Sequence, residues 1–544
     1  MKAINKILAL AAVSSLSLVS CNDLDTEPMG GTVTSDQKEQ VYEGDPAMIE
    51  AAVNAVPGMT YVMMGNYDSF GRVDTDFGFP SLNIMYDSRS NDMPSKLGDY
   101  QWYTAALTLE DFSDNYFNNL ISWNTMYNLI YTSNDLAKVI PMDTEQPYNQ
   151  MALAQALAFR AYGYFYLAQL YQFTYVGHED EPTVPLITHL NAEQVALEGT
   201  PRASNREIYA QIVEDYTNAI ELLEKSEAAG QPRINKTFIN STVALVLRAR
   251  AYLNMGMYDE CIADVNKALQ KAQAEGLAPY SIQKASAPAF NALADNNVLW
   301  GLNIDPSFIG SAAVRSFAGM MGCWLNGMGY FRYGFFRCIN KALYESIPST
   351  DVRKAWWLDG DAKPAATIPA AYKDYITNHE SFGCAEFEPY VQMKFGAYQN
   401  NVGTTIPASE IPTMRMEELY LILAEAQGRK SVGEGVNTLV NFVKTYRDPS
   451  YALSAGSTEE FINALWWQRR VELWGEGFAY FDIMRLKRSI DRRGGGFDPT
   501  LVFVVAPEDP CLIYVIPQTE QQANPQIGTI TSTASAPVPV PDNN

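Results

Sequence analysis

Histidine and cysteine are scarce in this chain: its 544 residues include only three histidines and six cysteines. The histidines, His178, His189 and His379, lie too far apart to have the spacing of metal ligands. The HExxH, GxSxG, P-loop and CxxC motifs are also missing. These absences exclude the enzymes that such motifs define. They predict a protein that is not an enzyme and that holds no metal ion and no cofactor.

One enzymatic alternative survives these absences, the hydrolysis of a glycosidic bond by two carboxyl groups. Glu386 with Glu388, or Asp359 with Asp361, would supply an acid and a base. The distance between the two carboxyl groups decides whether a pair can do this work, and sequence does not give that distance. Hydrolase activity therefore stays open as the less favoured alternative.

Basic residues are also few, since 39 Lys and Arg face 62 Asp and Glu, for a formal charge of −23. Removal of a leader that contains Lys2 and Lys6 makes the charge −25. A chain with this charge repels phosphate backbones. The sequence therefore predicts no nucleic-acid partner.

Long apolar runs are missing after the N-terminus, and the run at Ile7–Val19 is too short to span a bilayer. It follows two lysines and ends in Leu18-Val19-Ser20-Cys21, which resembles a lipobox. The alternative is an ordinary secretory leader that happens to contain a cysteine. We predict a signal peptide at 1–20, a lipid anchor on Cys21 and an acidic tether at 21–44. Several acyl chains on one cysteine hold a protein on a membrane stably.

Helical repeats are the dominant pattern in the sequence. Small and aromatic residues recur in Ala244–Leu269 at tetratricopeptide-repeat spacing, which predicts two closely packed helices with Cys261 as a small buried apolar residue. One helix pair cannot bury its own apolar face, so further pairs are expected on both sides. Capping boxes at Ser204–Glu207 and Ser457–Glu460 mark two more helix starts. We predict a mostly α-helical scaffold at about 111–275 and 413–492.

Two segments, about 65–110 and 276–412, lose the helical period and combine polar side chains with aromatic rings. Rings suit the apolar C–H faces of a sugar, and Asp, Asn and Arg suit its hydroxyls. The first segment is predicted as a surface loop, and both are expected to project from one side of the scaffold as one shallow site. The alternative for any single ring is an irregular wedge buried against the scaffold. The candidate ligand-binding residues are Tyr86, Asp87, Arg89, Asn91, Asp92, Trp102, Trp324, Asn326, Tyr330 and Tyr333.

The remaining cysteines allow disulfides in an exported chain. Cys323 with Cys338 is the preferred pair, because it closes a modest loop within the aromatic insertion. Free thiols at Cys323, Cys338, Cys384 and Cys511 are the alternative.

Four stretches, taken in order, resemble the SusD/RagB family of outer-membrane nutrient-binding lipoproteins, and they extend over nearly the whole chain. The third is the most specific, and its charged residues, Arg469, Glu472, Glu476, Asp482 and Arg485, are predicted to be a structural network. The stretches are RAYGYFYLAQLY at Arg160–Tyr171, RMEELYLILAEAQ at Arg415–Gln427, RRVELWGEGFAYFDIMRLKR at Arg469–Arg488 and IPQTEQQANPQI at Ile516–Ile527.

The resemblance implies four tetratricopeptide-like helix pairs that support a less regular ligand-binding half, in one body at 45–530 with a Pro/Ser/Thr-rich tail at 531–544. It also implies a cell-surface lipoprotein of the outer membrane that passes its ligand to a SusC-like TonB-dependent transporter. The ligand is a glycan or, in some branches of the family, a peptide. The family's usual Gly-x-Pro-Leu ending is stretched here to YQFTYVGHEDEPTVPLI at 171–187. No ligand residue transfers by motif, and a pure protein-interaction scaffold stays open as a further alternative.

Overall fold

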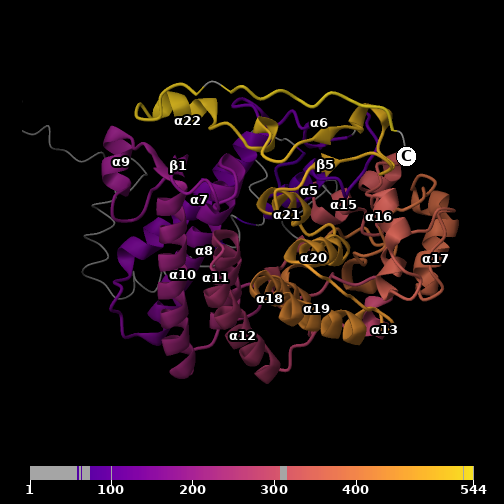
Figure 1. Cartoon of the computed structure of the whole chain (residues 1–544), viewed down its shortest axis with the longest axis horizontal. Helices are drawn as coiled ribbons and strands as arrows, with labels where there is room; N and C mark the ends of the chain where they lie inside the picture. Colours follow the sequence, from indigo (N-terminus) through magenta and orange to yellow (C-terminus); the bar gives the residue numbers. More distant parts are fainter. Residues whose placement is uncertain are drawn as a thin grey trace, which may run out of the picture. The chain divides into compact units, whose positions relative to one another are not determined.

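Helices packed in pairs make up much of the part of the chain that the computed structural model describes, residues 58, 59, 63, 74–99, 101–306, 315–530 and 532–542. All of these residues belong to one unit, Val53–Asn544. The mostly α-helical fold class is confirmed (Figure 1). The predicted signal peptide, the lipid-modified Cys21 and the tether at 21–44 lie outside the described residues.

The repeat scaffold is a row of helices, each packed on the next, which runs from the magenta helices to the orange ones in Figure 1. The two predicted runs of repeats join directly, because α12 packs on α18 although an insertion of more than a hundred residues separates them in the sequence. The helices of the row are α7 (Phe117–Val139), α8 (Pro147–Tyr171), α10 (Asn205–Ala228), α11 (Ser241–Met255), α12 (Tyr258–Ala274), α18 (Met416–Lys430), α19 (Val432–Tyr446) and α20 (Thr458–Glu472).

Local sequence explains where these helices begin. Ser204 Oγ accepts from the Glu207 N–H (3.2 Å) and the Glu207 carboxylate accepts from the Ser204 N–H (2.7 Å), which is the predicted capping box of α10. The second predicted capping box, at Ser457–Glu460, forms only one of its two hydrogen bonds. Ser457 Oγ accepts from the Glu460 N–H (3.2 Å), but the Glu460 carboxylate accepts from the N–H of Gly456 instead (2.7 Å).

Small residues set how closely the helices approach. A Cβ on Gly163 of α8 would lie 2.9 Å from the Ile130 side chain of α7, so only glycine permits this contact. Gly256 ends α11 with a φ of 73°, in the left-handed region that favours glycine. Cys261 is fully buried as predicted, and burial raises the pKa of its thiol well above the usual value.

The charged residues of the 469–488 stretch form buried ion pairs, as predicted. Glu472 is fully buried and contacts the guanidinium groups of Arg353, Arg415 and Arg447. Burial alone raises the pKa of Glu472, but the arginines outweigh that effect and hold the pKa below its usual 4.5. The other pairs join Arg469 and Arg485 to Asp482, Arg485 to Glu425, and Glu476 to Arg415 and Lys394.

The insertion between the repeats is less regular, and one small antiparallel sheet pairs a strand from its first part with a strand at its end. Strand β3 (Val298–Leu302) pairs with β4 (Ile411–Arg415), with Val298 opposite Arg415. The other elements of this half are α5 (Phe79–Arg89), α6 (Thr104–Thr108), α13 (Ile282–Ala285), α15 (Phe317–Met321), η1 (Tyr330–Tyr333), α16 (Lys341–Ser346), η2 (Val352–Trp356), α17 (Ala370–Thr377), η3 (His379–Phe382) and η4 (Tyr398–Asn400).

Short elements connect the rest of the chain. Within the described residues, no helix is both long and apolar enough to cross a bilayer. The connecting elements are β1 (Pro182–Pro185) paired with β2 (Arg202–Ser204), α9 (Ala192–Glu198), α21 (Ala479–Arg485), β5 (Ile490–Asp491) paired with β6 (Val504–Val505), η5 (Pro499–Leu501), η6 (Pro510–Leu512) and α22 (Gln518–Ala523).

The C-terminal tail at 532–542 is extended and runs along the body as the last part of the yellow trace in Figure 1. The Val540 N–H donates to the Val502 carbonyl (2.8 Å), and the Val540 side chain packs on a buried cluster that includes Phe497. The Gly494 N–H donates to the Asp542 carboxylate (2.6 Å). These contacts attach the tail to the loop at 494–502.

The predicted Cys323–Cys338 disulfide is wrong for this structure, because the five described cysteines are all free thiols. Cys323 follows α15 and is fully buried. Cys338 lies on an extended segment that bridges to Val391, and its side chain is only partly covered. The two side chains therefore have different surroundings.

Candidate ligand-binding site

The first predicted stretch is a buried helix, so its assignment as a surface loop was wrong. All eleven residues of α5 are buried, among them the candidates Tyr86, Asp87 and Arg89. Asn91 and Asp92, which follow the helix, are buried as well. Of the candidates before residue 110, Trp102 alone is exposed, at 38%.

Distant partners explain why polar side chains of this stretch are buried. Arg89 forms an ion pair with Asp111 and stacks on the rings of Tyr480 and Tyr514, 4.9 and 4.8 Å from their centres. Arg470 pairs with Asp92 (2.5 Å). A buried cation with several partners costs little and fixes the backbone that carries it.

Asp87 accepts hydrogen bonds from the backbone N–H groups of Gly477 (2.9 Å) and Ala479 (3.2 Å). Burial raises the pKa of its carboxyl to about 7. Tyr86 donates from its hydroxyl to Ser122 (3.3 Å). These side chains fasten the stretch to the scaffold and are out of reach of a ligand on the surface.

In the second stretch, Trp324 and Tyr330 are fully buried, whereas Asn326 is exposed and Tyr333 is 42% exposed. The Trp324 indole N–H donates to the Phe395 carbonyl (2.8 Å), and its ring packs edge-on against Tyr372, with the ring centres 4.9 Å apart. The alternative of a buried wedge therefore describes Trp324 correctly. Its ring cannot serve as a flat platform for a ligand in this structure.

One hydrogen bond connects the two stretches. The backbone N–H of Trp102 donates to the hydroxyl of Tyr330 (2.9 Å). Behind this contact, the Arg337 guanidinium lies between the rings of Tyr103 and Tyr330, 4.9 and 5.1 Å from their centres. The hydrogen bond joins two segments that are 228 residues apart in the sequence. Whether they form one ligand site stays a prediction.

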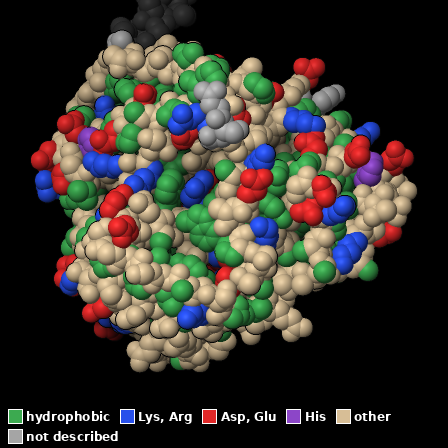
Figure 2. Space-filling model, turned by 45° about the vertical axis from the view of Figure 1, so that its right-hand side comes forward, with side chains coloured by type: hydrophobic (Ala, Val, Ile, Leu, Met, Phe, Trp, Pro, Cys, Tyr) green, Lys and Arg blue, Asp and Glu red, His purple; other side chains and the backbone are tan. Residues whose placement is uncertain are grey.

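Three candidates remain on the surface: Trp102, Asn326 and Tyr333. The Arg332 guanidinium lies 5.6 Å from the centre of the Tyr333 ring. Exposed rings with an amide and a guanidinium nearby offer what a sugar needs, an apolar face and hydrogen-bonding groups at its edge. Acidic and basic side chains are intermixed on the face that Figure 2 shows, with hydrophobic side chains between them.

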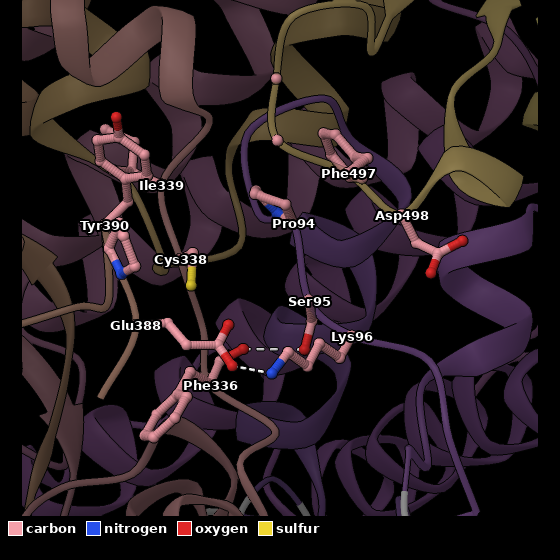
Figure 3. Close-up of a pocket in the computed structure, with 13 residues that line it drawn as sticks. Pro94, Ser95, Lys96, Phe336, Cys338, Ile339, Glu388, Tyr390, Phe497 and Asp498 are labelled. Atoms are coloured by element: carbon pink, nitrogen blue, oxygen red, sulfur yellow. Dashed lines mark hydrogen bonds and ion pairs between the residues drawn. The ribbon is translucent and has the colours of Figure 1, made fainter. Parts of the chain in front are cut away.

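A pocket of about 370 Å³, shown in Figure 3, was missed by the sequence analysis. Four segments line it: 94–96, 336–339, 388–390 and 495–498. They are far apart in the sequence, and the glycine run before Phe497 is the one local feature that hints at a close approach of backbones.

The carboxylates considered for hydrolysis do not form an acid–base pair here. Glu388 forms an ion pair with Lys96, and Glu386 is exposed. Asp359 accepts from the Asp361 N–H (2.9 Å) within a turn. Among the residues that the structure describes, no group of three His, Cys, Asp or Glu side chains could hold a metal ion.

The fold combines a helical-repeat scaffold with a less regular half that carries exposed rings. This combination is typical of a class of binding protein, and comparison with family models identifies the class. Residues 79–253 match a family model described as starch-binding, associating with the outer membrane, and residues 370–540 match the SusD family model. The chain belongs to the SusD/RagB family. The families matched are of SusD-like carbohydrate-binding proteins associated with the outer membrane, which agrees with the prediction that the chain binds rather than catalyses.

Solved structures show the same fold. A SusD-like carbohydrate binding protein from Bacteroides vulgatus is similar with a TM-score of 0.70 and 22% identity, over 88% of this chain and 97% of the other. A SusD superfamily protein from Bacteroides thetaiotaomicron has a TM-score of 0.69 and 22% identity, over 88% and 98%. Surface glycan-binding protein A from Bacteroides thetaiotaomicron, in complex with laminarihexaose, has a TM-score of 0.59 and 15% identity, over 88% and 98%. No curated protein sequence matches the chain.

Proposed function

We propose that this protein captures a glycan at the cell surface and delivers it to a SusC-like TonB-dependent transporter in the outer membrane. The observation that carries the proposal is the hydrogen bond from the Trp102 N–H to the Tyr330 hydroxyl, which joins the segment of the exposed Trp102 ring to η1, the short helix that also carries the exposed Tyr333. A fixed platform of rings loses little conformational entropy on binding. Membership of a starch-binding family supports a glycan as the ligand.

The proposed organisation follows the sequence. A signal peptide at 1–20 is removed, acyl chains on Cys21 anchor the protein in the outer membrane, and 21–44 is a tether to the body at 45–530. The net charge of −23 and the mixed charges of the surface in Figure 2 support an uncharged or weakly charged ligand over a nucleic acid.

Isothermal titration with a panel that contains maltohexaose, laminarihexaose and a mixture of short peptides tests the ligand class. Saturable heat with one of the glycans supports the proposal, and heat with the peptides alone would replace it by a peptide-binding function. Product release on incubation with the same glycans would indicate a hydrolase instead. Co-purification of a TonB-dependent receptor with the tagged, membrane-extracted protein tests the proposed partner.

A further inference from the structure

The pocket in Figure 3 is connected through Gln101 to the segment that carries the exposed Trp102 ring, called here the Trp102 surface. Gln101, the residue before Trp102, donates from its side-chain amide to Ser95 Oγ (2.9 Å) and to the Lys96 carbonyl (2.8 Å). Ser95 and Lys96 line the pocket. The side chain of Gln101 therefore joins the backbone of the exposed ring to the wall of the pocket.

Backbone hydrogen bonds hold the pocket open. The Cys338 N–H donates to the Pro94 carbonyl (3.3 Å), the Ile339 N–H to the Tyr390 carbonyl (3.1 Å), and the Lys341 N–H to the Gly495 carbonyl (2.9 Å). These bonds join residues 338–341 to each of the other three lining segments in turn. The walls are thus fixed before a ligand arrives, which lowers the entropic cost of binding.

The walls of the pocket are mostly apolar rings and prolines, and its charged groups are one cation, Lys96, and two carboxylates, Glu388 and Asp498. Figure 3 shows Tyr390 and Phe497 on opposite sides, with the ion pair of Lys96 and Glu388 below them in this view. Asp498, the other charged residue of the lining, accepts from the N–H (2.9 Å) and hydroxyl (2.6 Å) of Thr500 in its own turn. An anionic ligand would find no unpaired cation in the lining.

The size of the pocket limits what it can hold. At about 30 Å³ of liquid volume per water molecule, about 370 Å³ holds roughly a dozen waters. This volume is at the small end of ligand pockets, which range from about 300 to 1,000 Å³. It suits one or two sugar rings.

We infer that this pocket is a binding position for one or two uncharged sugar units, a chain end or a branch, of a glycan that also contacts the Trp102 surface. The inference rests on the proposed function and extends it. The apolar C–H faces of the sugar pack on Tyr390 and Phe497, and its hydroxyls bond to the Lys96 ammonium and the Glu388 carboxylate, which keep each other charged and oriented.

Two variants test the pocket by titration with maltohexaose and laminarihexaose. Cys338→Phe puts a ring into the cavity, because the Cys338 side chain lines it. Glu388→Gln keeps the shape but breaks the ion pair with Lys96. We expect each variant to weaken binding of the glycan that wild type binds by about tenfold. Glu386→Gln, which changes an exposed carboxylate outside the pocket, is the matched control and should bind as wild type does.

Hexagalacturonate, an anionic probe, should bind wild type at least about tenfold more weakly than the neutral hexasaccharide, since no cation of the pocket is unpaired.

A thermal melt of Cys338→Phe shows whether this variant folds, and Glu388→Gln alone tests the pocket if Cys338→Phe does not fold. Wild-type affinity of Glu388→Gln and of a folded Cys338→Phe, alongside weakened binding by Trp102→Ala, would overturn the pocket inference alone. A wild-type protein that binds none of the glycans would overturn the proposed function and this inference with it. Tighter binding of hexagalacturonate would overturn the uncharged character of the ligand.

Discussion

The backbone N–H of Trp102 and the hydroxyl of Tyr330 form a 2.9 Å hydrogen bond that joins the segment of the exposed Trp102 ring to the aromatic insertion. Tyr330 is fully buried, and the Arg337 guanidinium lies over its ring. The buried residue therefore positions the exposed one. The proposed binding surface depends on this contact.

Removal of the Tyr330 hydroxyl tests that positioning. In Tyr330→Phe the Trp102 N–H loses its partner, which we expect to cost about 1 kcal/mol of stability and to weaken glycan binding several-fold as the Trp102 segment loosens. Urea unfolding and isothermal titration measure the two effects. Tyr131→Phe, at a 64% exposed ring on α7, is the control and should leave the free energy of unfolding unchanged. Equal affinity of Tyr330→Phe and wild type would show that the hydrogen bond does not position the ring.

Trp324 distinguishes a core ring from a ligand platform. Because the ring is fully buried and hydrogen-bonded to the Phe395 carbonyl, Trp324→Ala should lower the free energy of unfolding by about 3–5 kcal/mol. Chemical denaturation gives this value directly. A loss below about 1 kcal/mol would contradict the burial of this side chain.

The buried carboxylate of Glu472 predicts a dependence of stability on pH. Its pKa is held below 4.5 in the folded state, where Arg353, Arg415 and Arg447 pair with it, so its contribution is present above the unfolded pKa and is lost as the pH falls through the folded pKa. Glu472→Gln should cost about 3–5 kcal/mol at pH 7, because it leaves buried arginines without their partner.

The difference in unfolding free energy between wild type and Glu472→Gln should shrink as the pH falls below 4.5. Urea titrations of both proteins between pH 3 and pH 7 measure it. Glu459→Gln, at an exposed carboxylate in the first turn of the same helix, is the control and should follow wild type at every pH. A constant difference across the range would contradict the depressed pKa.

The proposed anchor depends on Cys21, so Cys21→Ala should leave the melting temperature unchanged and release the protein from the membrane fraction. Stable attachment requires more than one acyl chain, and all of them are lost with this cysteine. Fractionation after a carbonate wash measures the effect. Equal retention of Cys21→Ala and wild type on membranes would remove the lipoprotein interpretation.

The repeat scaffold could be predicted because its signals are local. Ser204 and Glu207 cap one helix within four residues, and the small residues of α11 and α12 recur at the spacing at which helices pack. The predicted charged network of 469–488 was also right, since buried acidic and basic residues need partners of opposite charge, although Glu472 and Glu476 find theirs outside the stretch.

The site was harder to predict because long-range contacts decide burial there. Arg89 and Asp87 are polar and lie in a segment with no apolar stripe, which favoured a surface loop. Asp111 and the backbone of Gly477 and Ala479 satisfy these side chains instead, and no local pattern shows that. Trp324 and Trp102 have similar sequence surroundings, yet only Trp324 is buried, with its indole N–H bonded to the Phe395 carbonyl. The pocket was missed for the same reason, because its four walls meet only in the fold.

The most direct test of the central claim is the glycan affinity of Trp102→Ala, measured by isothermal titration with the hexasaccharide that wild type binds. A ring that is 38% exposed contributes little to the core, so the melting temperature should stay within about 2 °C of wild type. Affinity should fall by about tenfold or more, because stacking on an aromatic face is lost. Tyr131→Ala, at an exposed ring on α7 outside the site, is the matched control and should bind as wild type does. Unchanged affinity of a folded Trp102→Ala would contradict the account.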